Sequence, residues 1–251
     1  MPKSKTVYKR SEGLSKMDSS YCPGCTHGII HKLVAETLVE LDVLDRSIGI
    51  SSVGCSALNY DFFSCDMQQA PHGRAPAVAT GIKRVRPNSI IFTYQGDGDL
   101  ASIGIAEAIH AAHRSENITI VFVNNAIYGM TGGQMSPTTL LGQKTTTSPD
   151  GRTASQGLPL KIAEMMATIP GATYIERVSV HNPQHVNKAK KALKKAFTIQ
   201  KENKGFTLIE FISTCPVNWG MTPKDAIDWA VDNMIPYYPL GVFKDATEGE
   251  K

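Results

Sequence analysis

The chain has 251 residues, of which 41% are hydrophobic and 20% are charged, and these fractions exclude a disordered or fibrous protein. Its 26 basic and 23 acidic residues give a net charge of +3, which is too small to indicate a nucleic-acid partner. No apolar run approaches the roughly 20 residues of a membrane span, and the N-terminal segment lacks the apolar run of a signal peptide. We therefore expect a globular, cytoplasmic protein with no nucleic-acid or membrane partner.

Runs typical of buried strands alternate with helical patterns along the chain. Helices that connect consecutive strands indicate one α/β domain, with a mostly parallel sheet flanked by helices. We expect a flexible arm over about residues 1–20, an irregular segment over about 130–160 and a flexible tail over about 244–251. The predicted helices are 28–44, 100–114 and 183–201, and the predicted strands are 47–53, 89–95, 118–125, 172–178 and 206–213.

A short acidic glycine motif, Gly96-Asp97-Gly98-Asp99, follows directly after the strand 89–95. Glycines let the backbone approach a phosphate, and a helix N-terminus favours an anion. Asp97 would repel that anion unless a divalent cation lay between them. Asn125 ends the next strand, 28 positions after Asp97, so both side chains reach one edge of a parallel sheet. Asp and Asn oxygens, a backbone carbonyl, diphosphate oxygens and water would together complete the octahedron that Mg²⁺ requires.

The motif GDG, followed by 25 residues and NN, resembles the thiamine diphosphate-binding motif. This resemblance implies that Asp97, Asn125 and the carbonyl of Ile127 bind Mg²⁺. It also implies that the loop 128–134, YGMTGGQ, closes over the same diphosphate. The residues that we expect to contact the cofactor are Gly54, Cys55, Ser56, His72, Gly73, Gly96, Gly98, Asp99, Tyr128, Gly129, Met130 and Thr131.

Four of the five cysteines lie where a shared site is feasible. Cys22 and Cys25 form a CxxC pair before a helix, a pattern that fits a zinc knuckle, a redox dithiol or half of an iron–sulfur site. Cys55 and Cys215 each follow a predicted strand, so all four thiols can converge at one edge of the sheet and suit a 4Fe-4S cluster. Cys65 has no matching role, and we expect it to be a small buried apolar residue.

Together, CPGC, GCS, GDGD, NN and CPVNWG resemble the β subunits of 2-oxoacid:ferredoxin oxidoreductases over nearly the whole chain. The resemblance implies that the four cysteines bind a 4Fe-4S cluster. It also implies that His72 and Arg74, in the segment HGR, face the thiazolium ring or a substrate carboxylate as candidate catalytic residues. His27 and His31 are spaced like a metal-binding pair, but we expect ordinary helix residues there.

The implied reaction is thiamine-dependent oxidative decarboxylation of a 2-oxo acid to acyl-CoA and CO2, with electrons passing through the cluster to ferredoxin. The class also needs a glutamate from a pyrimidine-binding domain, for which the chain is too short. We therefore expect a pyrimidine-binding α subunit, with further small subunits. The rival hypotheses are a non-redox thiamine diphosphate decarboxylase or carboligase subunit, and a non-catalytic binding module with a degenerate motif.

The substrate is the least determined part of this interpretation. No Lys or Arg lies between Cys55 and His72, which slightly favours a branched-chain oxo acid such as 2-oxoisovalerate over 2-oxoglutarate. A pyruvate- or 2-oxoglutarate-specific member of the same family is the alternative.

Overall fold

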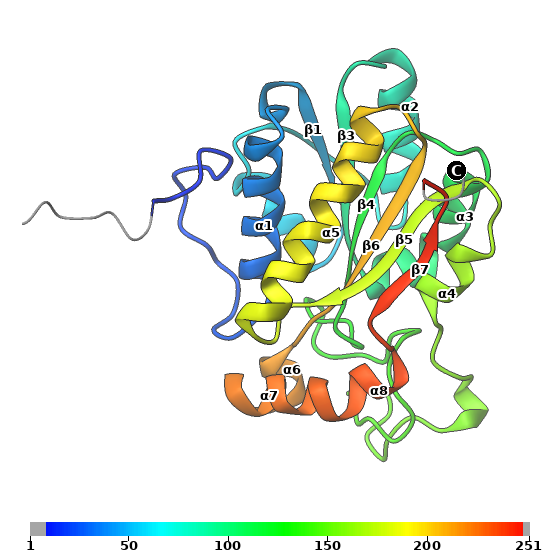
Figure 1. Ribbon diagram of the computed structural model, residues 1–251. Helices are drawn as coiled ribbons and strands as arrows, with labels where there is room; N and C mark the ends of the chain where they lie inside the picture. The colour runs from blue at the N-terminus through cyan, green and yellow to red at the C-terminus, as the bar shows by residue number, and fades with distance from the viewer. Residues whose placement is uncertain (1–8, 248–251) are drawn as a thin grey trace, which may run out of the picture.

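A single seven-stranded sheet forms the centre of the computed structural model, which describes residues 9–247 (Figure 1). Its strand order is β2-β1-β3-β4-β6-β5-β7, and only the edge strand β7 is antiparallel to its neighbour. The predicted mostly parallel α/β sheet is therefore confirmed. The strands are β1 (Ser47–Ser51), β2 (Asp66–Gln69), β3 (Ile90–Gly96), β4 (Thr119–Asn124), β5 (Ala172–Ser179), β6 (Phe206–Ile212) and β7 (Gly241–Asp245).

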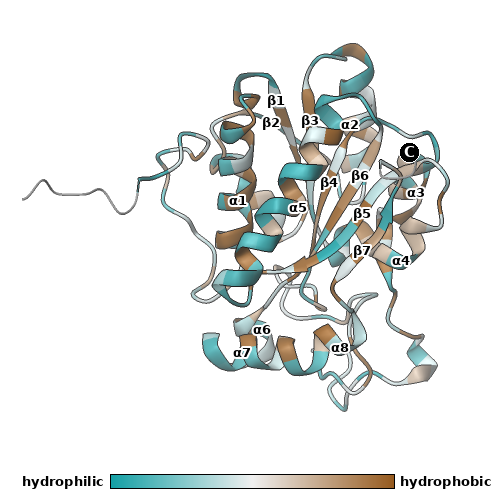
Figure 2. Cartoon of the chain, in the orientation of Figure 1, coloured by the Kyte–Doolittle hydropathy of each residue, from teal (hydrophilic) through white to brown (hydrophobic). Residues whose placement is uncertain are grey.

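Helices cover both faces of the sheet. The helices α1 (His27–Glu40) and α5 (Pro183–Lys201) pack on one face, and α2 (Ala75–Val85), α3 (Ile105–His113) and α4 (Ile162–Ala167) pack on the other. Neighbouring strand residues point to opposite faces, so Ile91 joins the core under α2, α3 and α4, while Phe92 joins the core under α1 and α5. Figure 2 shows the matching pattern, with apolar strands inside and a hydrophilic outer surface on α5.

Local sequence explains the central elements. The β4 run TIVFVN is buried at every position, as expected for a strand covered on both faces. The helix α5 begins at Pro183, and the side chain of Asn182 accepts a hydrogen bond from the His185 backbone nitrogen at 2.9 Å.

The carboxyl ends of the parallel strands meet the irregular parts of the chain. The long segment between β4 and α4 lies at this end, together with α6 (Pro216–Trp219), α7 (Pro223–Trp229) and α8 (Ile235–Tyr237) (Figure 1). The shorter helical turns are η1 (Leu44–Arg46), η2 (Cys55–Asp61), η3 (Asp99–Ile103), η4 (Ala154–Gln156) and η5 (Ala230–Met234).

Several predicted boundaries need correction. The first helix ends at Glu40, and the helix predicted for 100–114 is divided at Gly104 into the π-helix η3 and α3. Residues 1–8 and 248–251, parts of the expected arm and tail, lie outside the described residues. Inside them, Leu14 pairs with Phe63, and the expected tail begins as strand β7 because Lys244 and Asp245 pair with β5. Among the described residues, no helix is long and apolar enough to cross a membrane.

Candidate functional site

A cavity of about 360 Å³ lies at the carboxyl ends of β1, β3 and β4. All the residues expected to contact a cofactor line it, except Gly73, and so do the three expected metal ligands. Two further lining residues, His27 and Val53, were not predicted from the sequence, and a third, Gln134, is the last residue of the loop 128–134 that was expected to close over the diphosphate. The complete lining is His27, Val53, Gly54, Cys55, Ser56, His72, Gly96, Asp97, Gly98, Asp99, Asn125, Ile127, Tyr128, Gly129, Met130, Thr131 and Gln134.

Three oxygen atoms converge inside this cavity. The oxygen of the Asn125 amide faces only other oxygens, with Asp97 Oδ1 at 3.1 Å and the Ile127 carbonyl at 2.8 Å. Octahedral Mg²⁺ with ligands at roughly 2.0–2.1 Å spaces neighbouring ligand oxygens about 2.9 Å apart. The three groups could therefore hold such a cation. Without one, turning the amide over would let its nitrogen donate to both oxygens.

Asp97 is held by hydroxyl groups that the sequence analysis missed. Ser136 Oγ and Thr138 Oγ1 donate to Asp97 Oδ2 at 2.7 and 2.5 Å, and the Gly98 backbone nitrogen donates to Oδ1 at 3.0 Å. Burial raises the pKa of Asp97 to about 6, and these hydrogen bonds oppose the rise. The available signal was the hydroxyl-rich run SPTT at 136–139, inside the irregular segment predicted over about 130–160.

The two glycines of the motif have different surroundings. A Cβ added at Gly96 would meet no atom within 4 Å, whereas one added at Gly98 would lie 2.3 Å from a carbon of the Tyr128 ring. Gly96 therefore leaves open space for an approaching ligand. Gly98 is needed because the Tyr128 ring packs against its backbone.

Asp99 lines the cavity, but its carboxylate is bound to neighbouring protein groups. It accepts hydrogen bonds from Ser52 Oγ at 2.8 Å, from the Gly73 backbone nitrogen at 2.6 Å and from Gln95 Nε2 at 2.6 Å. His72 Nδ1 lies 2.6 Å from the same carboxylate. Asp99 thus fixes the segment that places His72 at the cavity.

The structure does not bring Arg74 to the cavity. Arg74 precedes α2, and its guanidinium forms an ion pair with Glu107 of α3. Gly73 lies behind the cavity wall, where a Cβ would lie 2.7 Å from Ile103. Of the segment HGR, only His72 therefore lines the cavity.

Four thiols gather beside the cavity. Cys55 lines it, and a Cβ on Gly129 would lie 3.2 Å from Cys55 Sγ and 3.6 Å from Cys215 Sγ. Burial, together with the smaller effect of the neighbouring thiols of Cys215, Cys55 and Cys22, raises the pKa of Cys25 to about 12. The rise in the Cys25 pKa caused by burial is thus larger than any decrease that the N-terminus of α1 causes.

These thiols do not form a site for a single metal ion. Across residues 9–247, no three His, Cys, Asp or Glu side chains lie close enough to bind one ion. A four-iron cluster has a different requirement, because each cysteine binds a different iron. All five cysteines are free of disulfide bonds. Cys65 is half-buried, and its sulfur contacts the sulfur of Met67 at 3.9 Å.

His27 and His31 are interior residues of α1. His27 stacks on Tyr21, and its Nδ1 lies 2.9 Å from the Tyr94 hydroxyl, while His31 Nδ1 lies 3.0 Å from the His27 carbonyl. Burial lowers the pKa of His27 to about 3, so the ring is neutral near pH 7. The expectation of ordinary helix residues missed one feature, which is that His27 also lines the cavity.

Comparisons with known proteins agree with this geometry. The family model "Thiamine pyrophosphate enzyme, C-terminal TPP binding domain" matches residues 52–211, and thiamine pyrophosphate is thiamine diphosphate. The ketoisovalerate oxidoreductase subunit VorA of Methanothermobacter marburgensis is 45% identical over 95% of the chain, which spans only 50% of that relative's length. The 2-oxoglutarate synthase subunit KorB of Methanocaldococcus jannaschii is 38% identical over 92% of the chain and 82% of the relative.

A solved structure gives the same result. The 2-oxoglutarate:ferredoxin oxidoreductase from Magnetococcus marinus superposes with a TM-score of 0.78 at 28% identity, over 95% of this chain and 85% of that one. The family resemblance seen in the sequence is confirmed. The chain belongs to the thiamine pyrophosphate enzymes and, among them, to the cofactor-binding subunits of the 2-oxoacid:ferredoxin oxidoreductases.

Proposed function

We propose that this chain is the thiamine diphosphate- and cluster-binding subunit of an enzyme that oxidatively decarboxylates a 2-oxo acid to an acyl-CoA and CO2, with ferredoxin as electron acceptor. One observation carries the proposal: Cys55 lines the same cavity as Asp97 and Asn125. A redox group bound at the thiols would therefore lie beside a cofactor bound at the metal site.

The donor set fits Mg²⁺ and a diphosphate. Asp97, Asn125 and the Ile127 carbonyl offer three hard oxygens, the Asn125 oxygen lies within 3.1 Å of each of the other two, and the open space at Gly96 admits a phosphate. The two hydroxyls on Asp97 Oδ2 keep that carboxylate in place, which leaves Oδ1 facing the Asn125 amide. These residues would hold the metal, and the loop 128–131 would line the cofactor.

The thiols fit a 4Fe-4S cluster better than zinc. Gly129 lies beside both Cys55 and Cys215, and a Cβ on it would contact the two sulfurs at 3.2 and 3.6 Å. Asn218 Nδ2 lies 3.3 Å from Cys215 Sγ and donates to the Gly129 carbonyl at 2.8 Å, which fixes this side of the site. Hydrogen bonds to ligand sulfurs are one means by which proteins adjust cluster potentials.

When bound, the two cofactors would supply carbanion chemistry and one-electron transfer, respectively. The contribution of this chain is to bind and orient. Asp99 holds His72 at the cavity wall, and Tyr128 packs against Gly98 to close the motif. The described lining includes no glutamate, so we propose that the ring-activating glutamate comes from a pyrimidine-binding partner subunit. Further small subunits would complete the complex.

The walls of the cavity favour a branched-chain substrate. The lining contains Val53, Ile127 and Met130 but no lysine or arginine, and Arg74 is paired with Glu107 instead of facing the cavity. A second substrate carboxylate, as in 2-oxoglutarate, would find no cation on this chain's described wall. The relative named for ketoisovalerate is 45% identical and the one named for 2-oxoglutarate is 38% identical, which supports the same preference.

A panel of substrates tests the proposed function. The chain would be co-expressed anaerobically with its neighbouring subunit genes, and viologen reduction measured with 2-oxoisovalerate, 2-oxoglutarate and pyruvate, each with and without coenzyme A. We expect the highest kcat/KM for 2-oxoisovalerate. A colourless, iron-free preparation that releases CO2 without reducing the dye would instead indicate a non-redox thiamine enzyme.

We also propose a cytoplasmic location. All five cysteines are free, and the proposed cluster ligands must stay reduced until iron binds. A reducing compartment meets this condition.

A further inference from the structure

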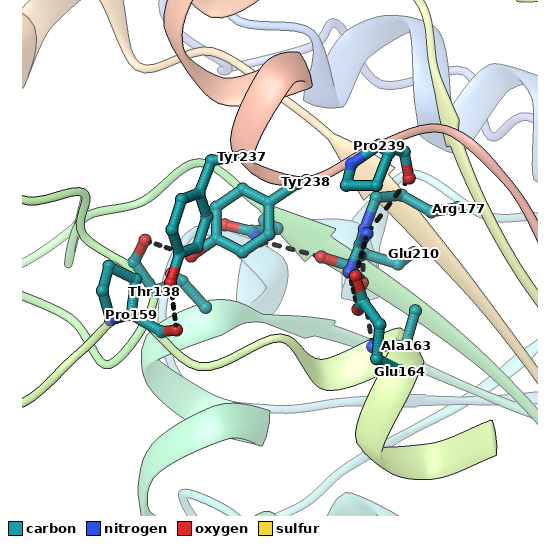
Figure 3. Close-up of polar contacts among 10 residues, drawn as sticks. Thr138, Pro159, Ala163, Glu164, Arg177, Glu210, Tyr237, Tyr238 and Pro239 are labelled. Carbon is teal, nitrogen blue, oxygen red and sulfur yellow. Dashed lines mark hydrogen bonds and ion pairs between the residues drawn. The ribbon is translucent and has the colours of Figure 1, made fainter. Parts of the chain in front are cut away.

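A buried ion pair lies between the neighbouring strands β5 and β6. Arg177 and Glu210 are cross-strand partners in the sheet register, and both side chains are completely buried. Arg177 Nε lies 3.0 Å from Glu210 Oε2, while its terminal nitrogens donate to both carboxylate oxygens of Glu164 (Figure 3). Charges are costly to bury, so a pair of this kind suggests a role that apolar residues could not fill. The proposed function gives it none.

Glu210 is connected to the end of β4 through one side chain. Glu210 Oε1 accepts a hydrogen bond from Asn124 Nδ2 at 2.9 Å, and Oε2 accepts one from the Ala163 backbone nitrogen at 3.2 Å. The carboxylate orientation is thus fixed from two sides. Asn124 Oδ1 in turn accepts a hydrogen bond from the Ala126 backbone nitrogen at 3.1 Å. The Asn124 side chain therefore bridges Glu210 and the turn 124–127.

That turn has an uncommon backbone conformation. Ala126 has a φ of 56°, in the left-handed region that residues other than glycine rarely adopt. It lies between the proposed metal ligands Asn125 and Ile127, whose oxygens are 2.8 Å apart. The Ala126 carbonyl accepts hydrogen bonds from Thr139 Oγ1 at 2.7 Å and Gln143 Nε2 at 3.2 Å. The hydrogen bond from the Ala126 backbone nitrogen to Asn124 Oδ1 restrains the preceding peptide, between Asn125 and Ala126.

We propose that Glu210 is a positioning residue for the metal site, acting through Asn124 on the turn that places Asn125 and the Ile127 carbonyl. This inference rests on the proposed function, because it takes these two groups as Mg²⁺ ligands. A carboxylate is a stronger acceptor than a neutral group, so Glu210 fixes the Asn124 amide in one orientation. Arg177 provides the countercharge that the buried carboxylate needs.

A second connection links the same arginine to the other metal ligand. The Arg177 guanidinium lies 5.2 Å from the centre of the Tyr238 ring, and the Tyr238 hydroxyl donates to the Thr138 carbonyl at 2.6 Å (Figure 3). Thr138 Oγ1 donates to Asp97 Oδ2. Both metal-binding segments are therefore supported by groups that contact Arg177.

Metal affinity, measured separately from stability, tests this inference. The complex would be titrated anaerobically with Mg²⁺ at saturating thiamine diphosphate by calorimetry, and unfolding would be followed in parallel. We expect Glu210→Leu and Asn124→Ala to raise the Mg²⁺ Kd by about 10–100-fold, as is typical when a residue supporting metal ligands is removed. Glu210→Gln keeps one oxygen acceptor but places an amide nitrogen at the other position, so its Mg²⁺ Kd should lie between those of the wild type and Glu210→Leu.

The matched control is Gln200→Leu. Gln200 is also a completely buried polar residue, but it binds the backbone of Ile91 near the start of β3, away from the turn. It should lower stability and leave the Mg²⁺ Kd unchanged. Asn124→Ala leaves the Arg177–Glu210 pair intact, so it tests whether the link through Asn124 supports Mg²⁺ binding even if Glu210→Leu does not fold.

The possible outcomes separate the two proposals. If the wild type binds no Mg²⁺, or if Asp97→Ala binds it as tightly as the wild type, the proposed function fails. If these two behave as expected but Asn124→Ala binds Mg²⁺ normally, only the positioning role is wrong. The positioning role is also wrong if Gln200→Leu weakens Mg²⁺ binding as much as Asn124→Ala does, because the loss would then reflect general destabilisation.

Discussion

Removal of Arg177 should strongly destabilise the chain. Arg177→Met leaves the Glu210 carboxylate completely buried without its countercharge, and breaking such a pair costs about 3–5 kcal/mol of unfolding free energy. The substitution also removes the cation from between the rings of Tyr238 and Phe243, whose centres lie 5.2 and 4.8 Å from the guanidinium. For a domain of this size, we expect the Tm to fall by roughly 6–20 °C.

A double-mutant cycle separates the pair from its surroundings. Glu210→Met should also be destabilising. Arg177→Met/Glu210→Met removes both buried charges together and leaves the partly exposed Glu164 as the one carboxylate without its partner, although Asn124, the Ala163 nitrogen and the Pro239 carbonyl also lose a hydrogen bond. We therefore expect the double variant to lose less stability than the sum of the single variants, with an interaction energy of at least about 2 kcal/mol.

Urea unfolding followed by the fluorescence of Trp219 and Trp229 is a suitable assay. Arg84→Met is the matched control, since Arg84 pairs with Glu116 but is 61% exposed, and such a pair contributes less than about 1 kcal/mol. The reasoning would be refuted if Arg177→Met cost no more than Arg84→Met. It would equally be refuted if the two single effects added to within about 0.5 kcal/mol.

Five further substitutions test other parts of the site. Asp97→Ala should abolish Mg²⁺-dependent binding of thiamine diphosphate in a calorimetric titration, and unchanged affinity would show that the ligand set is wrong. Cys215→Ala should remove iron or make it labile in iron and sulfide analysis, and a full, stable iron content would exclude it as a ligand. Gly98→Ala forces a methyl group against the neighbouring aromatic ring and should cost about 1–3 kcal/mol in urea unfolding, whereas Gly96→Ala, with open space, should cost less. Burial holds the pKa of His27 at about 3, below the ordinary value of 6.5, so the unfolded chain takes up a proton that the folded chain does not. The contribution of the neutral His27 ring to stability is therefore fully present above pH 6.5 and is lost as pH falls toward 3. Between these values, the unfolding free energy of the wild type should fall with decreasing pH about 1.4 kcal/mol per pH unit more steeply than that of His27→Gln. Equal slopes would contradict a neutral, buried His27.

The sequence predicted the central strands because their signal is local. The strands β1, β3, β4, β5 and β6 are short apolar runs, and burial on both faces of a parallel sheet requires such runs. The edge strands were missed for the opposite reason. The β2 sequence DMQQ is mostly exposed and pairs with a single neighbour, so it carries no hydrophobic pattern.

The residues of the site also differ in whether their position could be predicted from local sequence. GDG and NN could be placed together because GDG follows one predicted strand and NN ends the next, and parallel strands bring their carboxyl ends to one edge. Thr138 could not be placed, because its contact with Asp97 spans 41 residues and depends on how an irregular segment folds back. Glu210 lies in the apolar run FTLIEFI, and only the strand register shows that it faces Arg177.

We propose that the metal site and the four thiols serve one reaction in one cavity. The most direct measurement is electron paramagnetic resonance of the anaerobically purified complex after mixing with 2-oxoisovalerate, with and without Mg²⁺ and thiamine diphosphate. We expect a reduced-cluster signal only when both are present, and no signal in Asp97→Ala, even though its iron content is unchanged. An iron-free complex, or cluster reduction that does not need thiamine diphosphate, would contradict it.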